Sequence, residues 1–269
     1  MKFSASAQVL SLWSYRGFVL GSVKREFQAK YRASMLGAAW TVLNPLSMIL
    51  IYTLIFSQLM RARIPGIDSA FGYSIYLCAG ILTWGLFAEI VSRTAGVFIE
   101  NANLLKKLSF PRICLPVVVV LGALVNFAIA FGLFLLFLLV TAQLPVWPLL
   151  GLIPLLMVQI IFSVGLGMVA GVLNVFFRDV GQALGILLQF WFWLTPIVYP
   201  AAIVPDWARR IIFDVNPMAP VIGGYQGIFV TGAWPDWSAL AKPLLLGFLL
   251  CALGLYLFRR HADEMVDEL

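Results

Sequence analysis

Two long stretches without any charged residue dominate the chain, one at residues 33–60 and one at residues 113–177. A helix rises ~1.5 Å per residue, and the hydrocarbon core of a bilayer is ~30 Å thick. The first stretch is therefore long enough to cross a membrane once, and the second is too long to be a single helix. This pattern predicts an all-α integral membrane protein.

Turn-forming residues divide these stretches and predict six transmembrane helices. The segment 141–148, which contains Pro145 and Pro148, ends one span before the next begins. Asn44-Pro45 interrupts the hydrogen-bond ladder of the first span and predicts a kink there. We expect the spans at about residues 38–60, 72–92, 115–140, 149–172, 180–199 and 239–258.

Shorter patterns lie within and between these spans. Gly167 and Gly171 form a Gly-x-x-x-Gly pair on the fourth span, which predicts close packing against another helix of the chain. Between the fifth and sixth spans, Asp206–Phe213 has the pattern of a short amphipathic helix. Met218–Val230 is apolar but too short to span, so we expect this segment to be re-entrant or interfacial.

Residues 8–32 have the pattern of an amphipathic helix. Val19, Val23 and Phe27 recur on one side of this helix, and glycine and polar residues recur on the other. The pattern predicts a helix lying in the membrane interface, and the alternative is an ordinary amphipathic helix packed on protein. The chain then divides into a cytoplasmic N-terminal segment (1–33), a six-span domain (34–258) and a cytoplasmic tail (259–269).

Composition and charge support a membrane location. Hydrophobic residues make up 62% of the chain and charged residues only 11%, which excludes a soluble globular domain. The net charge of +6 does not indicate nucleic-acid binding, because most of the positive residues flank apolar spans. Six spans place thirteen of the eighteen Lys and Arg residues on one side. The positive-inside rule makes that side cytoplasmic, with both termini there.

Catalytic and metal-binding patterns are absent from the sequence. There is no Gly-x-x-x-x-Gly-Lys-Ser/Thr stretch to hold ATP, and the single histidine, His261, lies in the tail. Cys78, Cys114 and Cys251 are far apart and have no metal-ligand spacing. We expect no catalytic residue, metal or cofactor on this chain. A membrane glycosyl- or acyltransferase is the less favoured alternative, because it would need a carboxylate pair or a His/Asp set near one interface.

One carboxylate lies near an apolar span. Glu89 is one helical turn before Arg93, so we expect an ion pair rather than a proton-transport site. Without such a site the chain has no visible means of driving transport uphill. If it transports, the energy should come from a partner on the cytoplasmic side.

Four sets of residues stand out along the chain. They are Tyr31-Arg32-x-Ser34-x-Leu36-Gly37-x-x-Trp40 with Asn44-Pro45; Asn101-x-x-Leu104-x-Lys106-Lys107-x-x-Phe110-Pro111-Arg112; Arg178-Asp179; and Thr195-Pro196-x-x-Tyr199 with Asn216-Pro217. In their order and placement these sets resemble the permease subunit of bacterial ABC exporters for lipid-linked polysaccharide, which include O-antigen, capsule and teichoic-acid exporters. The likeness covers nearly the whole chain and is greatest to the O-antigen branch.

The resemblance implies a homodimer of permeases in the bacterial cytoplasmic membrane, with two ATPase subunits that bind ATP and Mg²⁺. The substrate implied is undecaprenyl-diphosphate-linked polysaccharide, moved from cytoplasm to periplasm; teichoic acid, capsule, a drug or a small lipid are alternatives. In the family the loop between the second and third spans couples to the ATPase, although Lys and Arg are also expected in a plain topogenic loop. The coupling residues would be Asn101, Leu104, Lys106, Lys107, Phe110, Pro111 and Arg112.

The resemblance also places the translocation path along the first and fifth spans, with short gate helices on the periplasmic side. Aromatic rings suit such a path, because the C–H faces of sugars stack on them while the hydroxyl groups stay hydrated. Trp and Tyr also gather at membrane interfaces regardless of function, so lipid contact is the alternative for each ring. The candidates for the path are Trp40, Tyr52, Phe56, Phe190, Trp191 and Trp193.

Overall fold

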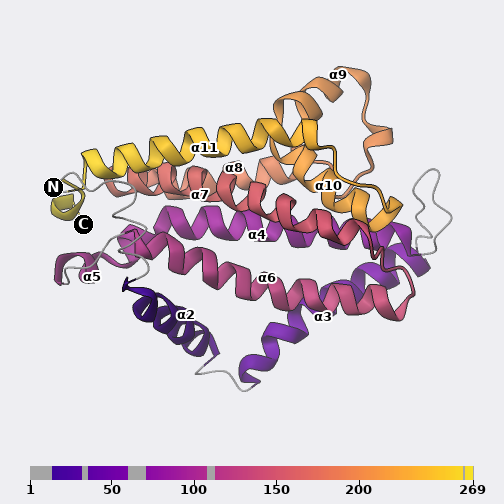
Figure 1. Ribbon diagram of the computed structural model, residues 1–269, viewed down its shortest axis with the longest axis horizontal. Coiled ribbons are helices and arrows are strands. Elements are labelled where there is room, and N and C mark those ends of the chain that lie inside the picture. The colour runs from indigo at the N-terminus through magenta and orange to yellow at the C-terminus, as the bar shows by residue number, and fades with distance from the viewer. Residues whose placement is uncertain (1–13, 32–35, 60–70, 108–112, 263, 269) are drawn as a thin grey trace.

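The computed structural model describes residues 14–31, 36–59, 71–107, 113–262 and 264–268, and these residues form helices and connecting turns without a strand. The longest helices run side by side, and α4 lies between α6 and α7 (Figure 1). The α-helices are α2 (Arg16–Tyr31), α3 (Trp40–Tyr52), α4 (Gly72–Glu100), α5 (Ala102–Lys107), α6 (Cys114–Val140), α7 (Leu152–Phe176), α8 (Asp179–Leu194), α9 (Asp206–Arg209), α10 (Met218–Thr231), α11 (Trp237–Arg260) and α12 (Glu264–Glu268). Shorter helical turns are η1 (Gly37–Ala39), η3 (Pro148–Gly151) and η4 (Ala201–Ile203), and the π-helical segments are η2 (Thr53–Leu59) and η5 (Arg210–Val215).

Four helical segments of the described chain are long and apolar enough to cross a membrane: Gly72–Glu100, Cys114–Val140, Pro148–Phe176 and Trp237–Arg260. The two remaining predicted spans are shorter. Trp40–Phe56 is a short apolar helix, and α8 has 16 residues, or ~24 Å of helix. The prediction of six full-length spans is therefore confirmed in part.

Two predicted boundaries differ from the observed helix ends. The helix predicted to end near residue 92 continues as α4 to Glu100, because Arg93 is a good helix former and does not end a helix. The span predicted to reach residue 199 ends as α8 at Leu194. Thr195 there has an extended backbone, as expected for a residue that precedes a proline.

The centre of the fold is a tightly packed set of helices, α4, α7 and α11. Gly167 and Gly171 on α7 face α4, where a Cβ on either would lie 2.7 Å from an atom of Thr94. Such distances leave no room for a side chain, so the glycines set the close approach of the two helices. The prediction that this glycine pair packs within the chain is confirmed.

Helix α2 lies beside α6 (Figure 1). Val19 is buried and Val23 and Phe27 are half-buried, whereas Lys24 and Gln28 are exposed. The predicted apolar side of the helix therefore faces protein, as the alternative interpretation of residues 8–32 proposed. The part of that segment before residue 14 lies outside the described residues, and a membrane-surface position of α2 stays a prediction.

The two ends of the helix bundle carry different elements. Helices α5 and α12 lie in contact at one end, and α9 and α10 lie toward the opposite end (Figure 1). The helix predicted near Asp206–Phe213 consists of α9 followed by the π-helical η5, and the apolar segment near Met218–Val230 is α10. The re-entrant placement of α10 in a membrane stays a prediction.

Candidate functional site

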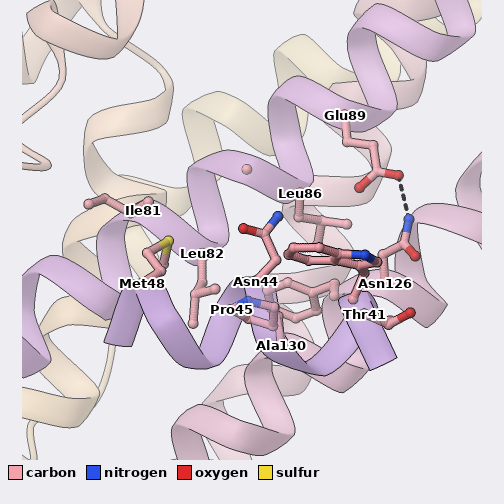
Figure 2. A pocket seen from close by; sticks show the side chains of 13 residues that line it. Thr41, Asn44, Pro45, Met48, Ile81, Leu82, Leu86, Glu89, Asn126 and Ala130 are labelled. Atoms are coloured by element: carbon pink, nitrogen blue, oxygen red, sulfur yellow. Dashed lines mark hydrogen bonds between the residues drawn. The ribbon is translucent and has the colours of Figure 1, made fainter. Parts of the chain in front are cut away.

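A cavity of about 580 Å³ lies between α3, α4 and α6. One side is apolar, and Met48, Ile81 and Leu82 contribute to it. Figure 2 shows the polar side chains around the cavity, which are Thr41 and Asn44 from α3, Glu89 from α4 and Asn126 from α6. Trp40, one of the predicted path residues, also lines it. The cavity thus combines an aromatic ring, an apolar wall and polar groups that can bond to hydroxyls.

Helix α3, which forms one wall of the cavity, is built irregularly. Pro45 lies inside it and cannot donate a backbone hydrogen bond, so the ladder is interrupted at the predicted place. After Tyr52 the chain continues as the π-helix η2, a form that is rare and frequently found at functional sites. The Thr41 hydroxyl is buried and has no partner among the described residues. These features weaken the internal hydrogen bonding of α3 next to the cavity.

The charged end of the cavity is a network that joins three helices. Glu89 Oε1 accepts hydrogen bonds from Arg93 Nη1 at 3.1 Å and from Asn126 Nδ2 at 2.8 Å. Arg93 also forms an ion pair with Glu26 of α2. Pairing is expected for ionisable groups within an apolar bundle, because an isolated charge there is costly. The predicted Glu89–Arg93 pair is confirmed, and the network links α2, α4 and α6.

Two members of this network were missed from the sequence. Glu26 is 67 residues from Arg93, and no local pattern joins them. Asn126 had a usable signal, because it is the one strongly polar side chain of the apolar segment Cys114–Val140. A lone amide in such a segment is expected to find a partner on a neighbouring helix. Gly122, one turn earlier on α6, leaves room for Arg93, whose Nη1 would lie 3.3 Å from an added Cβ.

The predicted coupling segment begins with a helical corner. The Asn101 carbonyl accepts hydrogen bonds from the backbone N–H groups of Leu104 and Leu105, both at 3.0 Å, which starts α5 directly after α4. Lys106 is exposed on α5 and Leu104 is half-buried. Lys107 is the last residue of α5. The structure thus brings Asn101, Leu104, Lys106 and Lys107 onto one short element at the end of the bundle, whereas Phe110, Pro111 and Arg112 lie outside the described residues.

The predicted path aromatics fall into two environments. On α8, Phe190 and Trp193 are 72% and 60% exposed. Trp191, between them, packs edge-on against Trp84, Phe87 and Phe162, and donates its indole N–H to Asn216 Oδ1 at 2.7 Å. Sequence order alone could not separate these neighbours, since consecutive residues of a helix point in different directions.

The first-span aromatics also differ among themselves. Trp40 is 49% exposed at the cavity. Tyr52 and Phe56 are half-buried, with ring centroids 6.2 Å apart, and Phe56 contacts Tyr73 of α4 at 5.3 Å. The structure does not gather the six aromatics in one place within the chain: Trp40 lines the cavity, and Phe190 and Trp193 project outward from α8.

The chain turns sharply after α8, and the resemblance motifs Thr195-Pro196-x-x-Tyr199 and Asn216-Pro217 meet at this turn. Asn216 Nδ2 donates to the Thr195 hydroxyl at 2.9 Å, and Asn216 Oδ1 accepts from the Met218 N–H at 2.9 Å. The Tyr76 hydroxyl donates to the carbonyls of Pro196 and Tyr199, both at 2.8 Å. Side chains thereby satisfy the backbone of a non-helical segment, as an apolar environment requires.

Metal ligation has no support in the described ranges, because no three His, Cys, Asp or Glu side chains gather there in a way that would hold an ion. The polar groups described above are amides, hydroxyls and paired charges. They can form hydrogen bonds with a passing or bound ligand.

Comparison with known proteins gives a family match and several full-length relatives. Residues 19–230 match the family described as ABC-2 type transporter. The chain is 31% identical over 262 residues to the O-antigen export system permease protein RfbA of Myxococcus xanthus, covering 97% of this chain and 98% of the relative. It is 30% identical over 237 residues to the protein of the same name from Klebsiella pneumoniae, covering 88% of each. It is 22% identical over 251 residues to the polysialic acid transport protein KpsM of Escherichia coli, covering 91% of this chain and 93% of the relative.

The four sets of residues indicated a resemblance to permeases of polysaccharide ABC exporters, and these matches confirm it. The family match covers most of the chain, including α3, the cavity and the turn after α8. The chain belongs to the ABC-2 type transporter family.

Proposed function

We propose that this chain is the membrane permease of an ATP-driven exporter of undecaprenyl-diphosphate-linked polysaccharide, with O-antigen as the class of polymer. The observation that carries the proposal is the 31% identity to an O-antigen export permease over 97% of the chain. The KpsM relative is less similar, at 22%, so a capsule-type polymer is the second candidate. Teichoic acid, a drug or a small lipid are further alternatives that no relative's name supports.

The functional unit in this proposal is a homodimer with two ATPase subunits. Helices α3 and α8 each have an exposed apolar face. This face includes Leu50 on α3, with Leu54 on the following η2, and Ile186 and Phe190 on α8. Two copies that meet along these faces would enclose a path between them. In that arrangement Trp40, Tyr52, Phe56, Phe190 and Trp193 are the candidate path residues, and Trp191 holds α8 in place.

Energy would enter at the end of the bundle that carries α5. In the proposal the segment Asn101–Arg112 docks on the ATPase, whose closure moves α5 and, through it, the end of α4. The network of Glu26, Glu89 and Arg93 ties that part of α4 to α2 and, through Asn126, to α6. Since α3 borders a cavity and has an irregular ladder, it is the element best suited to move against α4 and α6.

The location that fits this function is the bacterial cytoplasmic membrane, with both termini and α5 on the cytoplasmic side. The gate elements α9, η5 and α10 would then face the periplasm. Single cysteines at Lys106 and Trp207, tested with a membrane-impermeant thiol reagent, examine the orientation. Labelling of the Lys106 variant and not of the Trp207 variant in intact spheroplasts would contradict it.

Reconstitution tests the function. Vesicles are prepared with this chain, its ATPase and fluorescent undecaprenyl-diphosphate-linked polysaccharide, and the fraction of polymer that crosses the membrane is measured with and without ATP. An ATPase that lacks its phosphate-binding lysine is the matched control. The proposal predicts ATP-dependent export by the wild-type pair alone. Transfer of sugar by the purified chain without ATP would instead favour a membrane transferase.

A further inference from the structure

A second cavity, of about 610 Å³, lies at the end of the bundle opposite α5 and α12. Its lining residues come from η5, α10, the start of α11 and the turn after α8, together with Tyr76 of α4. Its volume falls within the ~300–1,000 Å³ typical of small-molecule sites. Its lining is largely apolar with a few polar groups, which is the usual composition of a ligand site. The gate role proposed above for η5 and α10 does not assign a ligand to this cavity.

An aromatic ring lies at this cavity. Trp234, in the connection between α10 and α11, lines the cavity and is 53% exposed. An exposed indole has an apolar face and a polar N–H, so it can stack on the C–H face of a sugar and donate a hydrogen bond to a hydroxyl. The alternative is that Trp234 only contacts lipid. That role would not explain why its ring lines a cavity that also contains carboxylates.

The wall formed by α10 is unusually bare. Gly223 and Gly227 line the cavity one helical turn apart, and a Cβ added at either would meet no atom within 4 Å. The packing of the chain therefore does not require glycine at these positions, although glycine is less favourable than alanine inside a helix. Because Gly223 and Gly227 have no side chains, they leave a flat backbone surface against which a planar ring can lie.

The ionised side chains that line the cavity are carboxylates. Asp214 and Asp236 line it, and no Lys, Arg or His is among its described lining residues. One cation lies nearby, because the Lys242 ammonium of α11 donates hydrogen bonds to the backbone carbonyls of Asp214 and Val215. Asp236 Oδ1 accepts hydrogen bonds from the Ser238 hydroxyl at 2.6 Å and from the Ser238 N–H at 3.0 Å. These bonds, with one from the Ala239 N–H, lower the pKa of Asp236, so it stays ionised at neutral pH.

We propose that this cavity is a binding subsite for neutral sugar units of the exported polymer. The proposal rests on the proposed function and sharpens it, because it names the class of repeat unit. Carboxylates accept hydrogen bonds from sugar hydroxyls and repel acidic sugars and phosphate, while Trp234 and the α10 wall hold the ring between them. A polymer of acidic sugars would not be stabilised here.

Binding to the purified chain is measured first, since it does not depend on transport. The full-length protein in lipid nanodiscs is mixed with neutral hexasaccharides of glucose, mannose, galactose or rhamnose, and with hexamers of sialic acid or glucuronic acid. Saturation-transfer NMR reports which oligosaccharides bind. We expect at least one neutral oligosaccharide to bind and the acidic ones to bind more weakly. Equal or stronger binding of the acidic hexamers, or no binding of any neutral one, would overturn the proposal.

Variants then locate the binding in the cavity. Trp234→Ala should weaken binding about tenfold and Trp234→Phe much less, because the phenyl ring retains stacking. Gly227→Leu should abolish binding by filling the cavity. Gly132→Leu is its matched control, since position 132 on α6 also has open space around its Cβ. Unchanged binding in Gly227→Leu would place the sugar elsewhere and contradict the proposal.

The charge argument has its own variants. Asp214→Asn with Asp236→Asn keeps the hydrogen-bonding shape and, at position 236, keeps a good helix cap. We expect the double variant to bind the sialic acid hexamer about fivefold more tightly than wild type, because repulsion is removed. If nanodiscs rich in phosphatidylethanolamine abolish sugar binding, the cavity is a lipid site and the proposal fails.

Export assays separate this proposal from the function on which it rests. One outcome would reject the subsite and leave the exporter intact. In it, the wild-type chain exports polymer, and Gly227→Leu and Trp234→Ala export polymer and bind oligosaccharide as well as the wild type does. Absence of ATP-dependent export by wild type, with Trp234-dependent sugar binding retained, would reject the exporter and leave the subsite intact.

Discussion

The apolar helices of this protein are held in two different ways. In the central set, α4, α7 and α11, backbones approach so closely that a Cβ on Gly165 would lie 2.8 Å from the Cys251 nitrogen. Likewise, a Cβ on Gly247 would lie 2.9 Å from the Phe162 nitrogen. Helices α3 and α8 instead pack on one face, and α3 borders a cavity of about 580 Å³.

The comparison teaches that hydrophobicity alone does not decide which helices are fixed. In a membrane, apolar faces gain little by leaving lipid, so close packing of small residues holds helices together. We therefore expect the glycine contacts to hold the central set together as one body. Helix α8 is tied to this set by side chains, since the Gly181 N–H donates to Asn174 of α7 and Trp191 packs against Trp84, Phe87 and Phe162. Helix α3 contains no glycine, so we expect it to be the element that a transport cycle can move most easily.

The largest effect is expected from a side chain placed in the rigid contact. Gly171→Leu should destabilise the protein by about 3 kcal/mol or more, because its Cβ would lie 2.7 Å from the backbone oxygen of Thr94, which cannot move aside. Gly132→Leu on α6 adds the same side chain where no atom lies within 4 Å. The thermal stability of the two variants in detergent, monitored by size-exclusion chromatography after heating, should differ clearly. Equal stability would break the comparison.

A cross-link between α3 and α4 tests whether α3 moves during transport. Met48 on α3 and Ile81 on α4 both line the cavity. Cysteines at these positions, in a chain whose native cysteines are replaced, should allow a reducible bifunctional reagent to lock α3. We expect ATP-dependent export to fall nearly to background and to return on reduction.

A second cysteine pair in the central set is the control. Ile161 and Leu250 lie where α7 and α11 touch. If these helices move as one body, linking them should leave export unchanged. Loss of export with this pair, or full export with the pair across the cavity, would show that the division into rigid and movable helices is wrong.

The charged network that joins α4 to α2 and α6 should give an intermediate effect. Arg93→Met leaves Glu26 and Glu89 without their cation. Because the three side chains are 28%, 44% and 29% exposed, we expect a loss of only about 1–2 kcal/mol. The double variant Arg93→Met with Glu89→Gln should recover part of the loss. Chemical unfolding of the four members of this cycle in detergent measures the coupling, and purely additive losses would contradict the network.

The sequence predicted the local part of this arrangement. The Glu89–Arg93 pair and the Gly167–Gly171 contact follow from helical spacing, and the proline in α3 follows from residue type. Helix lengths were less predictable from the apolar runs, since α4 continues past the charged Arg93 to Glu100.

The long-range part of the site could not be predicted from spacing. Asn216 bonds to Thr195 and Trp191, 21 and 25 residues away, because the chain folds back after α8. This contact determines that Trp191 faces the core while Phe190 and Trp193 face outward. No periodicity in a run of four aromatics contains that information, since it arises only when α8 and α10 are brought together.

The smallest effect is expected at the start of α11, within the rigid set. Hydrogen bonds from the Ser238 hydroxyl, and then from the Ala239 and Ser238 N–H groups, lower the pKa of Asp236 below its usual value. The stabilisation from this helix cap is therefore complete above the unfolded-state pKa, and it is lost as the pH falls through the folded-state pKa. Asp236→Asn should therefore differ least from wild type at low pH and slightly more at neutral pH, as measured by unfolding in detergent between pH 3 and pH 7. Since Asp236 is exposed, its cap acts only on the first turn of α11, whereas Gly247 fixes the helix against α7. A loss as large as that of Gly171→Leu would mean that capping, rather than close backbone packing, holds the central helices together.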